Sequence, residues 1–212
     1  MIGENGAARV TVVDGDRVFL GSNEGGIRGD ARYVLDRFDL SYMKQFRCGS
    51  FGQLLLYRAR AAQLKAAGVT VSFDFSDDST DEYYEQIAPY VDFAFFSAAD
   101  AASEDEIRER LAWVKGLGPR FFVSARRVPR AAVAYDGERY YRQLAKPVTD
   151  MKDTMGAGDS FLTSFLMCYL DSAKRGEDGA EAIERALDFA AGFASTVCGM
   201  EGSWGHGAPI VE

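Results

Sequence analysis

Residues 69–77 read VTVSFDFSD, a largely apolar run that ends in acidic residues and predicts a buried strand. The segment before it, GQLLLYRARAAQLKAAG at residues 52–68, predicts a helix. Gly68 marks the expected end of that helix, because glycine tolerates the left-handed backbone of a helix C-cap. A helix that leads directly into a buried strand is typical of folds in which crossover helices connect parallel strands.

The same order of helix and strand continues along the chain. Ser103 is an expected N-cap, with Glu106 three residues later as in a capping box. Alternation at this spacing favours right-handed βαβ units, and it predicts an α/β fold whose mostly parallel central sheet has helices on both faces. The expected elements are helices at residues 80–90 and 103–118 and strands at residues 91–98 and 120–125.

The regions on either side of this core have other patterns. Residues 8–21, within ARVTVVDGDRVFLGS, predict a hairpin that turns at Asp14-Gly15-Asp16, and residues 131–144 predict another around Asp136-Gly137. Two long helices are expected after Pro147, and the apolar character of the first indicates a buried helix. Without a linker or an internal repeat, residues 1–212 are interpreted as a single domain.

Composition limits the classes of partner. The net charge is −8, and the one basic cluster is short (Arg126, Arg127 and Arg130), so no nucleic-acid partner is expected. No apolar run is long enough to span a membrane, and the first ten residues lack the pattern of a signal peptide. We therefore expect a cytoplasmic protein, in which the three well-separated cysteines are buried, reduced thiols.

The segment KDTMGAGDSF, residues 152–161, places two glycines and an aspartate at the start of the first of the two long helices. Glycines let successive backbone N–H groups converge, and the first N–H groups of a helix are unpaired and carry partial positive charge. The segment can thus form an anion hole, beside which Asp159 could accept a proton from an attacking hydroxyl. A tight turn in which Asp159 is only a capping carboxylate fits the spacing equally well.

Residues 153–161, DTMGAGDSF, resemble the signature D-T-x-G-A-G-D-x-F of the ribokinase-like (PfkB) sugar kinases. The resemblance implies that ATP is the phosphoryl donor, that Asp159 is the catalytic base, and that Gly156, Ala157 and Gly158 form the anion hole. The stretches FDFSDD, APYVDFAFFSA and DGERYYRQ are similar to fructoselysine kinases. That similarity implies phosphorylation of a primary sugar hydroxyl, the 6-hydroxyl of fructoselysine or a related fructosamine.

Further site residues follow from the same resemblance or from position in the fold. Asp74 ends a predicted strand, where open α/β sheets bind their ligands, and is a candidate for the sugar site. Asp153 and Thr154 resemble residues beside a monovalent-cation site, although a turn-forming role explains them equally well. The resemblance also implies Mg²⁺ at Asp100, a nucleotide contact from Ser124, and a flap at residues 8–21 that covers the sugar and pairs between two subunits. Trp204 could stack near the nucleotide base and the Arg126 side chain could meet a phosphate, although simple packing of Trp204 and an exposed basic loop without a ligand explain them at least as well.

The sequence departs from the family pattern in two places. No Gly-Gly-Asn segment precedes residue 8, so the fold is expected to be N-terminally truncated and to lack part of the sugar site. Residues 124–132, SARRVPRAA, contain no glycine where the family has a nucleotide loop, and Pro129 removes a backbone donor. These departures keep a second hypothesis open, a non-catalytic relative that acts as a binding or interaction module.

Overall fold

The computed structural model divides the chain into two compact units, each described here by itself. Unit 1 contains residues 1–26 and 143–212, and unit 2 contains residues 27–142. The single domain expected from the sequence stays a prediction. None of the described helices is long and apolar enough to cross a membrane. The structure describes residues 8–13, 16–22, 37–52, 58–77, 79–98, 101–120, 122–127, 131–203 and 205.

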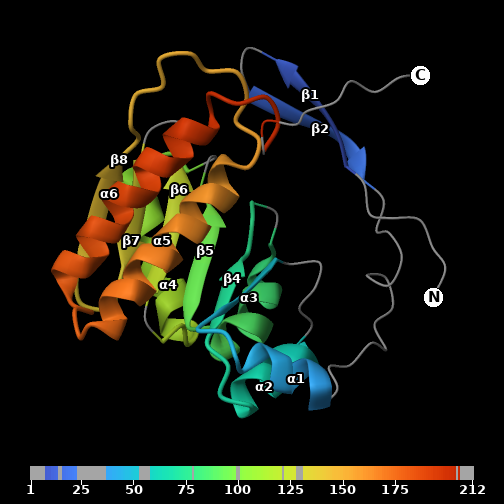
Figure 1. The fold of residues 1–212 in the computed structure, drawn as a ribbon, viewed down its shortest axis with the longest axis vertical. Coiled ribbons are helices and arrows are strands. Elements are labelled where there is room, and N and C mark those ends of the chain that lie inside the picture. The colour runs from blue at the N-terminus through green and yellow to red at the C-terminus, as the bar shows by residue number, and fades with distance from the viewer. Residues whose placement is uncertain are drawn as a thin grey trace. The chain divides into compact units, whose positions relative to one another are not determined.

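A six-stranded sheet forms the centre of unit 2, with its strands side by side in chain order (Figure 1). The first four strands pair in parallel, and the fifth turns back antiparallel to the fourth. This arrangement confirms the mostly parallel sheet that the sequence predicts. The strands are β3 (Gly49–Gly52), β4 (Val71–Asp74), β5 (Phe93–Ser97), β6 (Phe122–Arg127), β7 (Ala131–Tyr135) and β8 (Tyr140–Leu144).

Helices α2 (Arg58–Ala66), α3 (Asp81–Ile87) and α4 (Glu104–Leu117) share one hydrophobic core with the sheet. Side chains alternate along a strand, so Val71 and Phe73 of β4 enter this core while Ser72 points the other way. Ser72 is also fully buried. Rings extend the packing beyond the strand, since Phe75 stacks on Tyr84 with ring centroids 4.2 Å apart.

The start of α4 confirms the predicted N-cap. The hydroxyl of Ser103 accepts a hydrogen bond from the Glu106 N–H at 3.1 Å, and the Glu106 carboxylate accepts one from the Ala102 N–H at 2.8 Å. The end of α2 also agrees, because Gly68 has a φ of 75°, the left-handed conformation that glycine adopts without strain. These local signals fix where the crossover helices begin and end.

The turn between β7 and β8 depends on one carboxylate. Asp136 accepts hydrogen bonds from the backbone N–H groups of Glu138 (2.8 Å) and Arg139 (2.7 Å) and from the Tyr141 hydroxyl (2.6 Å). Burial acts to raise the pKa of Asp136, but the hydrogen bonds from Tyr141, Arg139 and Glu138 outweigh it and lower that pKa below its usual value. The ionised form of Asp136 therefore holds the turn together.

We expect Asp136→Ala to lower the free energy of unfolding by about 1–2 kcal/mol at pH 7, because the turn loses a charged acceptor. A lowered folded-state pKa stabilises the protein above the unfolded-state value of about 3.9, and this stabilisation disappears as the pH falls through the folded-state pKa. Urea unfolding of both proteins from neutral to acidic pH measures the difference. Glu138→Ala, at the exposed neighbour, is the control. A difference that persists undiminished in acid would show that the charge is not what matters.

Unit 1 contains the hairpin of β1 (Ala8–Val13) and β2 (Asp16–Ser22), which pair antiparallel as predicted. Its role as a flap stays a prediction. Unit 1 also contains α5 (Ala157–Lys174) and α6 (Ala180–Val197), which pack side by side (Figure 1). Helix α5 includes Asp159 in its first turn, as the sequence predicts.

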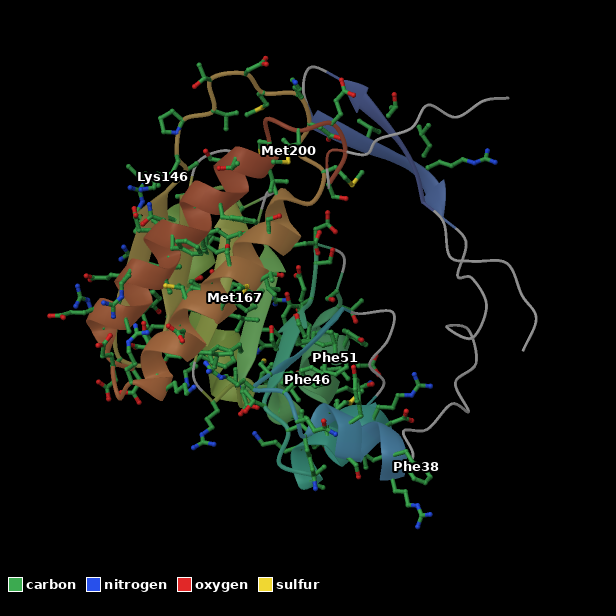
Figure 2. The ribbon with its side chains drawn as sticks, in the orientation of Figure 1. Phe38, Phe46, Phe51, Lys146, Met167 and Met200 are labelled. Carbon is green, nitrogen blue, oxygen red and sulfur yellow. The ribbon has the colours of Figure 1, made fainter. Side chains whose placement is uncertain are left out.

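Several large apolar side chains of the described residues are exposed. Met167 on α5 and Phe38 on α1 (Arg37–Met43) are each 68% exposed, and both are marked in Figure 2. Helix α1 has no fully buried residue and contacts the core of unit 2 through Leu40 and Met43. It is therefore held to the unit through a narrower apolar face than α2 or α4.

Candidate active site

The predicted phosphoryl-transfer segment folds as a tight turn that leads into α5. Gly156 is the N-cap of α5 and has a φ of 75°, a conformation that side chains other than glycine seldom adopt. A Cβ atom on Gly156 would lie 2.5 Å from the Cβ of Ser203 and 3.1 Å from its Cα. Glycine is thus required here twice, for its backbone conformation and for the close approach of the 203 segment.

The backbone N–H groups at the start of α5 are available to bind a ligand. No side chain caps the helix. Among the described residues, the N–H groups of Gly156, Gly158 and Asp159 donate to no protein acceptor, whereas the Ala157 N–H donates to the Thr154 carbonyl at 3.1 Å. Of the three residues expected to form an anion hole, the two glycines thus have amides without an acceptor in the described part of the chain, and so does Asp159. Unpaired amides at the positive end of an 18-residue helix favour binding of an anion.

The carboxylate of Asp159 lies in the first turn of α5 and is exposed. Within the described part of the chain, its oxygens accept no hydrogen bond from another residue. Free oxygens are what a general base needs, because a base that is already saturated with donors is a poorer proton acceptor. The position combines a proton acceptor with charge-stabilising amides within one helical turn.

Asp153 connects the turn to the segment after α6. Its Oδ1 accepts a hydrogen bond from the Met155 N–H at 2.8 Å, and its Oδ2 accepts one from the Gly202 N–H at 3.1 Å. The backbone N–H groups of Lys152 and Asp153 donate to the Cys198 carbonyl at 2.9 and 3.3 Å. Burial raises the pKa of the Cys198 thiol, and the Asp153 charge raises it further, so the thiol stays neutral beside this turn. These contacts support the turn-forming role of Asp153, and a cation site at Asp153 and Thr154 stays a prediction.

Three other predicted site residues belong to unit 2. Asp74 is the last residue of β4, and its carboxylate accepts a hydrogen bond from the Ser76 N–H at 3.0 Å. Ser124 is fully buried in β6 and its hydroxyl donates to the Val133 carbonyl at 3.5 Å, so the side chain has no surface to offer a nucleotide. The backbone of Arg126 pairs with Ala132 between β6 and β7, where the sequence suggested a loop.

Two predicted residues, Asp100 and Trp204, lie outside the described residues. Within the described ranges, no group of three or more His, Cys, Asp or Glu side chains could hold a metal ion. Mg²⁺ is commonly held by one or two carboxylates together with substrate phosphates, so such a site needs no cage of protein ligands. Magnesium binding at Asp100 therefore remains a prediction.

Comparison with known proteins identifies the family. The model of the pfkB family carbohydrate kinases matches residues 36–205, which include the turn and the start of α5. The chain belongs to the pfkB family of carbohydrate kinases. It is 36% identical to fructosamine kinase FrlD of Bacillus subtilis (strain 168) over 98% of this chain and 69% of that protein. It is 32% identical to fructoselysine 6-kinase of Escherichia coli (strain K12) over 77% of this chain and 60% of that one.

The fold is shared with solved members of this group. The structure of Arabidopsis thaliana ribokinase complexed with ribose and ATP superposes with a TM-score of 0.73 at 20% identity, over 93% of this chain and 64% of that one. This likeness confirms the ribokinase-like fold class that the sequence predicts. The chain spans roughly two thirds of the length of the relatives that it matches, 69% and 60% for the two named above.

Ser203 and Gly202 were not among the residues singled out from the sequence, yet both contact the turn. Both directly precede Trp204, which the sequence analysis does name as a candidate nucleotide contact. A contact between residues 49 positions apart, such as that of Asp153 and Gly202, leaves no local pattern. The structure therefore shows what the motif alone does not, namely that Gly202 and Ser203 hold the turn at the start of α5 in place.

Proposed function

We propose that this chain transfers the γ-phosphoryl group of ATP to a primary hydroxyl of a sugar, and that the sugar is a fructosamine such as fructoselysine, phosphorylated at its 6-hydroxyl. One observation carries this proposal. The exposed carboxylate of Asp159 stands in the same turn as the N–H groups of Gly156, Gly158 and Asp159, which have no acceptor among the residues that the structure describes.

Each part of this arrangement has a role in phosphoryl transfer. Asp159 accepts the proton of the attacking hydroxyl, and the amides of the turn donate hydrogen bonds to the phosphoryl oxygens on which negative charge spreads. ATP supplies the phosphoryl group, and a bound Mg²⁺ would neutralise part of its charge. Positioning and charge stabilisation account for most of the rate enhancement in this reaction class, so a fixed turn with free amides is the main requirement.

The choice of acceptor is supported by the relatives. A fructosamine kinase and a fructoselysine 6-kinase are 36% and 32% identical to this chain. A cytoplasmic location and a homodimer that forms through the hairpin of residues 8–21 complete the proposal.

The test is a phosphorylation assay with the purified chain. We expect ADP release and a sugar-phosphate signal in ³¹P NMR with fructoselysine and ATP, and weaker turnover with free fructose or ribose. If no sugar in the panel is phosphorylated while the protein is folded, the proposal fails. The alternative of a non-catalytic binding or interaction module would then be preferred.

A further inference from the structure

Unit 2 contains a cavity of about 540 Å³, and the described residues that line it include none of the predicted site residues. Its volume lies within the range of small-molecule sites, roughly 300–1,000 Å³. It opens where β4 and β5 end, and the carboxyl ends of parallel strands are where ligands bind in open α/β sheets. The lining comes from the loop after β4, the end of β5 and the facing sides of α3 and α4, as Ser76, Asp77, Ser79, Asp81, Tyr84, Phe96, Ser97, Ala98, Ala101, Glu106, Ile107, Glu109, Arg110 and Trp113.

The charges of this cavity suit a ligand that carries both a negative and a positive group. Four carboxylates line it, those of Asp77, Asp81, Glu106 and Glu109, against the single guanidinium of Arg110. Asp81 and Glu106 already have partners, because Asp81 pairs with Arg110 at 2.7 Å and Glu106 accepts the Ala102 N–H. The exposed carboxylates of Asp77 and Glu109 can receive a cation of the ligand, and one oxygen of Asp77 also accepts a hydrogen bond from the Ser76 hydroxyl at 3.3 Å.

Arg110 is held in a fixed position. Its guanidinium lies 4.6 Å from the ring centroid of Tyr84 and 4.2 Å from that of Trp113. It also donates to Asp81 at 2.7 Å. A guanidinium has five N–H donors, so it keeps donors for a further acceptor, and a rigid planar fork matches the geometry of a carboxylate.

The mouth of the cavity is a strained piece of backbone. Ser76 has a φ of 60°, and it is the one residue other than glycine with a positive φ in the described part of the chain. Hydrogen bonds hold it there, because its N–H donates to Asp74 and its carbonyl accepts the Ser97 N–H at 2.8 Å. Such strain costs about 1–3 kcal/mol and is concentrated at ligand sites.

We propose that this cavity binds the free amino-acid end of an amine-linked sugar, that is, the α-carboxylate and α-ammonium groups of a lysine-type amino acid. Arg110 receives the carboxylate, Asp77 and Glu109 receive the ammonium, and Trp113 and Ile107 flank the alkyl chain. This inference rests on the proposed function, since fructoselysine presents such an end. It assigns a binding site to the amino-acid end of the acceptor, which a kinase that acts on unmodified sugars would not need to recognise.

The test is a binding titration that requires neither ATP nor turnover. Trp113 lines the cavity, and the chain has two tryptophans, so Trp204→Phe leaves Trp113 as the sole fluorescent indole. We expect lysine and Nε-acetyl-lysine to change this fluorescence saturably with dissociation constants within about threefold of each other. Nα-acetyl-lysine and cadaverine, which each lack one charge of the α-end, are expected to bind at least about tenfold more weakly.

The variants are chosen so that folding is retained. Asp77→Asn combined with Glu109→Gln removes two exposed charges and is expected to raise the dissociation constant of lysine about tenfold. Glu85→Gln removes an exposed charge of α3 outside the cavity, is the matched control, and is expected to leave binding unchanged. Arg110→Lys keeps the positive charge but removes the planar guanidinium that can bind a carboxylate with two hydrogen bonds. It is expected to weaken binding by a similar factor. Thermal melting of each variant checks the fold.

Three results would overturn the inference: no saturable signal with lysine, equal binding of cadaverine and lysine, or equal effects of the double variant and Glu85→Gln. Failure of the kinase proposal gives a different outcome, since lysine would still bind while no sugar is phosphorylated. If both proposals hold, the double variant raises the KM for fructoselysine about tenfold and leaves the KM for free fructose unchanged.

Discussion

Asp159→Asn is expected to lower kcat by about 10²–10⁴, or about 3–5 kcal/mol of transition-state stabilisation, because the amide cannot accept the proton of the sugar hydroxyl. The substitution keeps the size and shape of the side chain, which is exposed. We therefore expect the free energy of unfolding to change by less than about 0.5 kcal/mol. The KM for ATP should also change little, because the backbone amides of the turn are untouched.

The measurement is the initial rate of ADP release with saturating ATP and acceptor, for both proteins at equal concentration. Glu181→Gln is the matched control, since Glu181 is the exposed first-turn acid of the neighbouring helix α6. It makes the same change of charge at another helix N-terminus and is expected to leave kcat within about twofold. Rates for Asp159→Asn that equal those of Glu181→Gln would remove Asp159 from the catalytic role.

The sheet of unit 2 could be predicted from the sequence because its signals are local. Strand β5 is buried and apolar from Phe93 to Phe96, and Ser103 and Gly68 mark helix ends through side-chain and backbone preferences of their own. The identity of Asp159 as a candidate base was equally local, since the motif and the start of the helix coincide. In these places the chain needs no distant partner to define its structure.

Contacts between segments that are far apart in the sequence could not be predicted. The motif does not reveal that the Asp153 carboxylate binds the Gly202 N–H, nor that the Ala157 amide is used within the turn. The position of the Arg110 guanidinium is fixed by rings from two different helices, Tyr84 of α3 and Trp113 of α4, which only tertiary packing brings together. A loop was suggested at residues 124–132, whereas β6 continues to Arg127, because pairing with β7 supplies backbone partners that the apolar pattern alone did not show.

Gly156→Ala tests the other half of the candidate site, the geometry of the amides. An alanine at a φ of 75° is strained by about 1–2 kcal/mol, and its Cβ would lie 2.5 Å from the Cβ of Ser203. Relief of that overlap must shift the turn or the 203 segment, at a typical further cost of about 1–3 kcal/mol. We expect the free energy of unfolding to fall by about 2–5 kcal/mol in total. A displacement of about 1 Å in the donors would lower kcat about 10²-fold.

Gly179→Ala is the matched control, because Gly179 is the N-cap of α6 but has a φ of −81° and no atom within 4 Å of the added Cβ. Its expected cost in urea unfolding is below about 1 kcal/mol. Adding Ser203→Gly to Gly156→Ala separates the two causes, since it removes the overlapping Cβ and leaves the backbone strain. We expect the double variant to regain about 1–2 kcal/mol of stability and part of the lost rate. If Gly156→Ala and Gly179→Ala cost the same, then neither the left-handed conformation of Gly156 nor its contact with Ser203 holds the amides in place.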